Sequence, residues 1–337
     1  MADEALRQRG LVEIMASYQL GSVEDLVPFS LKWNKLDKYR ESDVPWKWAC
    51  IFHGYLDSLT STKRRDVLHL LAKHTPERLT PTVLDIAAER GALDVLQFCT
   101  SCPEFRCTAD AIDYAATEGH FKIVQFLHTY RAEGCTTRAM NGAASRGHME
   151  IVAYLHANRT EGCTVYAMDG AAAHGHLDVL TFLHDRRHEG CTTQAIDLAA
   201  RNGHLDIVKF LHEHRSEGCT ADALTYALMY GKLDVAAYLQ SVGAEGCGDD
   251  ALYGAAWTGS LETVKFLCTG AQLQPYQPKV ITAAASRGHI HVVLYLQSVY
   301  STHVSWSSWC VHVVYAIAKH AWLQLNRTTL LSDQRMD

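Results

Sequence analysis

Apolar residues recur along most of the chain in a unit of about 28 residues, as in repeat architectures of this period. In each unit a run of small apolar residues is followed by a glycine and then by a run of large apolar residues. Counted on that glycine, the first six intervals are 28 residues each and the last is 29, through Gly91, Gly119, Gly147, Gly175, Gly203, Gly231, Gly259 and Gly288. The pattern predicts short elements that stack on their neighbours, because one unit alone is too small to bury its apolar face.

The first half of each unit predicts a helix with a small apolar face. In residues 191–218 this face carries Ala195, Ile196, Ala199 and Ala200, whose spacing fits one side of a helix. Gly203 is expected to end the helix, because glycine takes the left-handed conformation without strain. A threonine is expected to cap the start through its hydroxyl oxygen. It stands at Thr80, Thr108, Thr136, Thr164, Thr192 and Thr220, and the weaker cap Gly248 replaces it in the next unit.

The second half of each unit predicts another helix with larger apolar residues. After His204, the residues Leu205, Val208 and Leu211 form the expected apolar stripe, widened by Ile207 and Phe210. Each predicted helix has only two or three turns and would be marginal alone, so stability must come from packing between repeats.

The repeats divide the chain into three expected segments. Residues 52–298 are the repeat domain, with a degenerate first repeat at 52–79 in which Lys63 replaces the glycine. Residues 1–51 are expected to form an N-terminal helical cap or a docking segment. Residues 299–337 fit either a degenerate C-terminal cap or an unrelated tail.

Charge and hydropathy narrow the class of protein. With 37 acidic and 31 basic residues, the net charge of −6 argues against a dedicated nucleic-acid surface. The N-terminus has no apolar signal region, and the least polar late stretch, 304–318, is too short to span a bilayer. We expect a soluble, cytoplasmic monomer that binds no nucleic acid and no membrane, and we leave nuclear localisation open.

Eleven cysteines and nineteen histidines could suggest metal or redox chemistry, but many of them recur at the 28-residue spacing of the repeat. Equivalent residues of stacked repeats lie about 8–10 Å apart, too far for a disulfide or for shared zinc ligation. We therefore interpret the thiols as half-buried plugs of the inter-repeat turn. We expect His204 and its equivalents to hydrogen-bond backbone groups at the turn that follows the glycine of each repeat. The segment Cys99-x-x-Cys102-x-x-x-x-Cys107 keeps a metal- or redox-responsive protein as an alternative.

Other recurring polar residues predict a structural role rather than catalysis. An arginine stands two residues before a glutamate in four repeats, as in Arg159 and Glu161, and predicts an arginine–glutamate network along one edge. The chain has no GxSxG, HExxH, Walker or GxGxxG motif. We expect no enzyme, no metal and no cofactor.

The phrase Ala-Ala-x-x-Gly-His-Leu-Asp-Ile-Val-x-Phe-Leu at residues 199–211 resembles the ankyrin repeat, and the resemblance covers about residues 52–298. The family unit has about 33 residues and opens with Thr-Pro-Leu-His. Here that place reads Gln194-Ala195-Ile196-Asp197, and Asp85, Asn141 and Asp169 hold the histidine position elsewhere. The resemblance implies an all-α ankyrin-repeat solenoid of stacked antiparallel helix pairs, in which the missing residues leave the β-hairpin fingers truncated or absent.

The resemblance also implies a non-catalytic interaction scaffold that binds a protein partner on its concave face. Carried over to this chain, the partner-binding positions lie just before each glycine or one turn earlier: Arg90, Tyr114, Glu118, Arg146, His174, Leu198, Arg201, Asn202, Tyr226, Met229, Tyr230, Trp257 and Arg287. Tyr226, Tyr230 and Trp257 are expected to form an aromatic patch flanked by Arg201 and Arg287. The competing interpretation is that some of these side chains only pack on neighbouring repeats.

A second functional alternative comes from the N-terminal segment. Residues 11–15, Leu26 and Trp33 resemble part of an F-box, the module that docks ubiquitin-ligase cores. In that case the chain is an adaptor in which this segment recruits the ligase and the repeats select the client.

Overall fold

The computed structural model describes residues 50, 53–54, 56–57, 68–69, 79–100, 105–244, 248–269 and 278–300. The F-box-like segment, Cys102 and the C-terminal residues 299–337, apart from 299 and 300, lie outside these residues. No helix in the described ranges is long and apolar enough to cross a bilayer.

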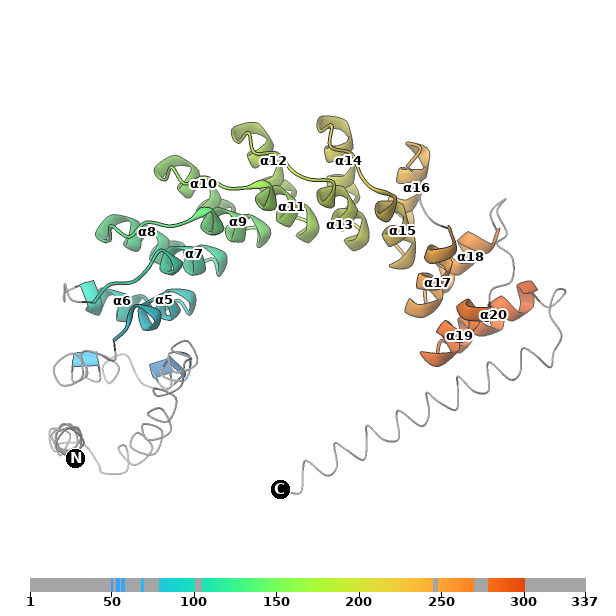
Figure 1. Ribbon diagram of the computed structural model, residues 1–337, viewed down its shortest axis with the longest axis horizontal. Coiled ribbons are helices and arrows are strands. Elements are labelled where there is room, and N and C mark those ends of the chain that lie inside the picture. The colour runs from blue at the N-terminus through green and yellow to red at the C-terminus, as the bar shows by residue number, and fades with distance from the viewer. Residues whose placement is uncertain are drawn as a thin grey trace, which may run out of the picture. The chain divides into compact units, whose positions relative to one another are not determined.

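The described residues form sixteen α-helices and contain no strand (Figure 1). The first helix of each repeat is odd-numbered: α5 (Pro81–Glu89), α7 (Asp110–Thr117), α9 (Thr137–Ser145), α11 (Val165–His174), α13 (Gln194–Asn202), α15 (Ala221–Met229), α17 (Gly248–Thr258) and α19 (Pro278–Ser286). The second helix is even-numbered: α6 (Leu93–Thr100), α8 (Phe121–Tyr130), α10 (Met149–Asn158), α12 (Leu177–Arg186), α14 (Leu205–His214), α16 (Leu233–Ser241), α18 (Leu261–Thr269) and α20 (Ile290–Tyr300). The predicted all-α architecture of helix pairs is confirmed.

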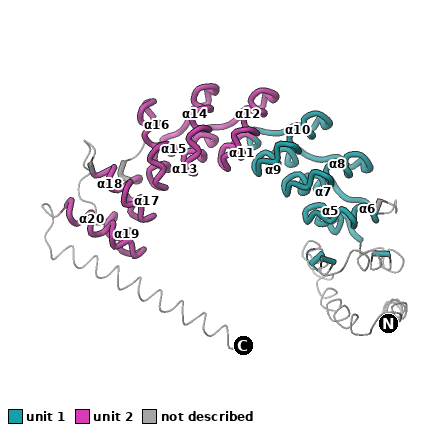
Figure 2. The backbone as a smooth tube through the Cα atoms, turned by 180° about the vertical axis from the view of Figure 1, so that it is seen from behind, with its two compact units in different colours: residues 1–167 teal, residues 168–337 magenta. Residues whose placement is uncertain are grey.

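The chain divides into two compact units, residues 1–167 and residues 168–337, with the boundary inside α11 (Figure 2). Within each unit, first helices pack against the first helix of the next repeat and against their own second helix. The pairs α5–α7 and α7–α9 do so in unit 1, and α13–α15, α15–α17 and α17–α19 do so in unit 2. Each unit therefore has a layer of first helices and a layer of second helices.

The first helices pack closely because their shared faces are built from small residues. Ala143 and Ala144 of α9 and Ala199 and Ala200 of α13 have no exposed surface. As predicted, Gly203 ends α13 in the left-handed conformation, with φ of 88°.

The second helices bury a narrower stripe than the sequence predicted. Ile207, Val208 and Leu211 of α14 are buried, whereas Leu205 and Phe210 are only half-buried. At about 100° per residue the three buried positions fall within one arc, and Leu205 and Phe210 fall on its two opposite sides. The predicted stripe was therefore misplaced at Leu205.

Candidate functional site

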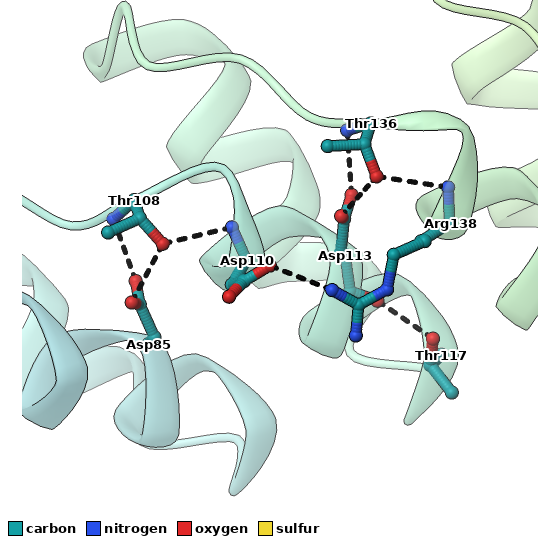
Figure 3. Close-up of polar contacts among 7 residues, drawn as sticks. All are labelled: Asp85, Thr108, Asp110, Asp113, Thr117, Thr136 and Arg138. Atoms are coloured by element: carbon teal, nitrogen blue, oxygen red, sulfur yellow. Dashed lines mark hydrogen bonds and ion pairs between the residues drawn. The ribbon is translucent and has the colours of Figure 1, made fainter. Parts of the chain in front are cut away.

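A hydrogen-bonded pair joins the first helices of successive repeats within each unit. Asp85 of α5 accepts bonds from the backbone amide and the hydroxyl of Thr108, both at 2.8 Å (Figure 3). The same pairing, always 23 residues apart, joins Asp113 to Thr136, Asn141 to Thr164, Asp169 to Thr192 and Asp197 to Thr220. We call these contacts the Asp–Thr pairs.

The threonine of each pair also caps its own helix. The hydroxyl oxygen of Thr136 accepts a bond from the amide of Arg138 at 3.1 Å, and Thr108, Thr164, Thr192 and Thr220 do the same for the residue two positions on. The predicted caps are confirmed there. Thr80 makes no such bond, and Pro81 follows it. The sequence showed the recurring aspartate, but only its constant spacing of 23 residues from the threonine could have indicated the pair.

Burial sets the electrostatics of these carboxylates. Asp113 has 1% of its surface exposed, and burial raises its pKa although the bonds from Thr136 oppose the shift. Asp85, Asp169 and Asp197 are also buried, and burial raises the pKa of each in the same way. These carboxylates face a threonine rather than solvent, so they act as structural acceptors.

The histidines at the start of the second helices reach back to the preceding repeat. Nε2 of His120 donates to the carbonyl oxygen of Glu89 at 2.8 Å, and Nε2 of His148 donates to that of Thr117 at 3.2 Å. Sequence reasoning placed these bonds at the local turn, but the carbonyls belong to the first helix of the preceding repeat. The partner differs because the imidazole lies over the glycine of the preceding repeat, Gly91 or Gly119.

The arginine–glutamate pairs and the cysteines close the turns between repeats. Arg159 binds Glu161, and the equivalent pairs Arg187–Glu189 and Arg215–Glu217 form as predicted. The pattern fails at Arg131, which donates to the carbonyl oxygens of Cys99 and Phe105.

The thiols of three cysteines lie close to these arginine and glutamate side chains. Burial raises the pKa of the Cys107, Cys135 and Cys191 thiols to about 11, and none of these three forms a disulfide. Among the described residues no three His, Cys, Asp or Glu side chains gather as a metal site needs.

The C-terminal turns of the first helices form a second feature, which we call the first-helix surface. It carries the predicted partner-binding residues. In unit 1 several of these residues contact a side chain of the neighbouring repeat. Arg146 lies 2.6 Å from Glu118, and Arg90 lies 3.3 Å from Asp57. The guanidinium of Arg138 lies over the ring of Tyr114. It also lies 3.0 Å from the carboxylate of Asp110 (Figure 3).

Unit 2 carries aromatic and arginine side chains on the same surface. The guanidinium of Arg201 lies 4.9 Å from the ring centre of Tyr230 and donates to its hydroxyl at 3.2 Å. The guanidinium of Arg287 lies 4.0 Å from the ring centre of Trp257. Tyr253 stacks on Trp257 with ring centres 6.3 Å apart. We call Arg201, Tyr230, Tyr253, Trp257 and Arg287 the aromatic–arginine patch.

The patch is open to solvent. Tyr230, Tyr253 and Trp257 expose 42%, 36% and 39% of their surfaces. Tyr253 was not predicted as a site residue, because only the positions before the glycine and a few one turn earlier were considered. Its signal was its place four residues before Trp257 on one helix.

The remaining predicted residues are divided between the surface and the inter-repeat packing. Met229 is half-buried, and its side chain fills the space that a Cβ at Gly254 would occupy. Asn202 is exposed but donates to the carbonyl oxygen of Ala173 at 2.6 Å. His174 bonds the carbonyl oxygen of Gly170, and Leu198 and Tyr226 are half-buried. These contacts support a structural role for Met229 and Asn202.

Comparisons with known proteins identify the repeat. Family models described as ankyrin repeats match residues 138–184, 168–247 and 196–277. Among solved structures, the human ASB11 ankyrin repeat domain matches with 18% sequence identity and a TM-score of 0.43, covering 55% of this chain and 96% of that chain. No curated protein matches the sequence.

Proposed function

This chain is an ankyrin-repeat protein, and we propose that it binds a protein partner on its first-helix surface without catalysing a reaction. Ankyrin repeats generally mediate protein–protein interaction. The recurring polar side chains support this role, because the Asp–Thr pairs and the histidines at the start of the second helices, such as His120 and His148, bond one repeat to the next. The side chains left for a partner are those that vary at the C-terminal turns of the first helices.

One observation carries the proposal: the aromatic–arginine patch of unit 2 exposes three large rings, one at the end of α15 and two on α17. Aromatic and arginine side chains are the residue types that dominate interface energetics. Two of the rings are held by an arginine of the neighbouring repeat, so little side-chain entropy is lost when a partner covers them.

The test is a pull-down from the cell of origin with wild type and with a Tyr230→Ala, Trp257→Ala variant. Each truncation of an anchor residue is expected to cost about 2 kcal/mol or more, so specific partners should fall at least about 30-fold. Tyr130→Ala is the matched control, because Tyr130 is 67% exposed but ends a second helix. Unchanged recovery of every specific partner by the double variant would overturn the proposal.

A further inference from the structure

The arginines of the first-helix surface differ in what they bind. In unit 1, Arg90 and Arg146 each pair with a carboxylate of the neighbouring repeat. Across the described ranges, Arg201 and Arg287 of unit 2 lie on aromatic rings and have no carboxylate within ion-pair distance.

The sequence explains the difference at Arg287. It occupies the repeat position of Arg146, directly before the glycine. Arg146 finds Glu118 at the same position of the preceding repeat, whereas Arg287 has Thr258 there. The position that neutralises the guanidinium in unit 1 therefore carries no charge in unit 2.

A guanidinium lying on a ring keeps donors available at its edge. Arginine has five N–H donors in a planar fork that matches a carboxylate. Arg201 uses Nη2 toward the hydroxyl of Tyr230, and the contact of Arg287 with Trp257 is through the ring face. Both side chains are exposed and already oriented, so they can receive an anionic group without first breaking an ion pair.

The nearby acidic side chains lie at the other ends of these helices. Asp222 and Asp250 are exposed in the first turns of α15 and α17. Each stands seven residues before Met229 or Trp257, which places it roughly 10 Å away along the helix axis. Arg201 and Arg287 thus lie at the C-terminal ends of first helices, as Tyr230 and Trp257 do, whereas these two carboxylates lie in first turns.

We propose that the patch binds an acidic, extended protein segment, with carboxylates at Arg201 and Arg287 and apolar side chains on the rings between them. The inference rests on the proposed function and names the chemistry of the partner. Successive first helices pack about 8–10 Å apart, so α13 and α19 are separated by roughly 24–30 Å. At about 3.3 Å per residue, an extended segment of roughly seven to nine residues covers that length.

The experiment is a selection of displayed nine-residue random peptides on the full chain, followed by titration of the selected peptides in labelled form. Selected peptides should carry Asp or Glu near both ends and an apolar residue between them. Arg201→Gln and Arg287→Gln should each weaken binding by about tenfold or more, since a hydrogen bond to a charged group is lost. Arg186→Gln is the matched control, because Arg186 is exposed but ends the second helix α12, outside the first-helix surface, and it should leave the affinity unchanged.

The outcomes separate the two proposals. Neutral or basic peptides whose binding is lost in Tyr230→Ala, Trp257→Ala would overturn the acidic segment and leave the binding surface standing. A selection whose peptides are indifferent to both ring substitutions, or that yields no peptide, overturns the inference and counts against the surface as well. Tighter binding of a single-stranded oligothymidine probe than of any acidic peptide, with the same dependence on Arg201 and Arg287, would also overturn it.

Discussion

Asp113 and Thr136 belong to different repeats but share two hydrogen bonds. The amide of Thr136 donates to Oδ1 of Asp113 at 2.8 Å, and its hydroxyl donates to Oδ2 at 2.5 Å. The same hydroxyl accepts from the amide of Arg138, so one threonine oxygen links the buried Asp113 of one repeat to the start of the next repeat's first helix (Figure 3).

Asp113→Ala should lower the free energy of unfolding by about 1–3 kcal/mol, because it leaves the amide and hydroxyl of Thr136 without their acceptor. Asp113→Asn should cost less, since Asn141 already bonds Thr164 at 2.9 and 2.8 Å in the neighbouring repeat. Urea unfolding followed by circular dichroism measures both. Equal losses for the two variants would contradict this account of the pair.

The pairing stops after Thr220, where Thr225 and Gly248 occupy the next aspartate and threonine positions. A carboxylate and a threonine hydroxyl cannot meet there, so amides of α17 should exchange with solvent faster than amides of α13. A double-mutant cycle with Thr225→Asp and Gly248→Thr should show a favourable coupling of about 1 kcal/mol. Hydrogen exchange should slow in α17 of the double variant only. Additive effects of the two changes would argue against this prediction.

Gly119 and Gly218 allow the contact with histidine to be separated from backbone conformation. Both have positive φ, 84° and 70°, so alanine at either should cost about 1–2 kcal/mol in strain. A Cβ at Gly119 would lie 2.6 Å from Cε1 of His148, whereas nothing lies within 4 Å of a Cβ at Gly218. Gly119→Ala should therefore be the more destabilising by about 1–3 kcal/mol in thermal or urea unfolding. Equal costs would show that the ring moves aside freely.

The pair of Arg159 and Glu161 should make stability depend on pH. The hydrogen bond from Arg159 lowers the pKa of Glu161 from 4.5 to about 2. Because the folded pKa is below the unfolded one, this contribution is present above pH 4.5 and is lost as pH falls toward 2. Glu161→Gln should be less stable than wild type at neutral pH, and the difference should vanish near the lower end of that window. A difference in melting temperature that does not change with pH would contradict the assignment.

The buried aspartates act in the opposite direction. Burial raises the pKa of Asp113 above 3.8, so its contribution is present below that value and is lost as pH rises through the raised pKa. The stability cost of Asp113→Asn relative to wild type should therefore shrink from acid to neutral pH in the same titration.

The period predicted those features that depend on neighbours close in sequence. Gly203 ends α13 and Thr136 caps α9 as expected, because glycine conformation and capping are properties of a few adjacent residues. The Asp–Thr pairs were not predicted, because the stacking distance between repeats brings their members together across 23 residues.

The candidate site was predicted in composition but not in geometry. The sequence placed Arg201 and Arg287 beside the aromatic residues, and the structure adds that each lies on a ring of an adjacent repeat. We predicted Met229 as a surface residue, but its side chain packs against Gly254 of the next repeat, where the missing Cβ leaves room for it. Whether the patch binds a partner stays a prediction.

The inter-repeat bonds have a direction along the chain. In every Asp–Thr pair the backbone amide of the later repeat's threonine donates to a side-chain oxygen of the earlier repeat. The imidazoles of His120 and His148 likewise donate to backbone carbonyls of the preceding repeat's first helix. During synthesis from the N-terminus, we expect the repeats up to the one that Thr220 opens to form these bonds on a preceding repeat that is already folded, so that each acts as a template for the next.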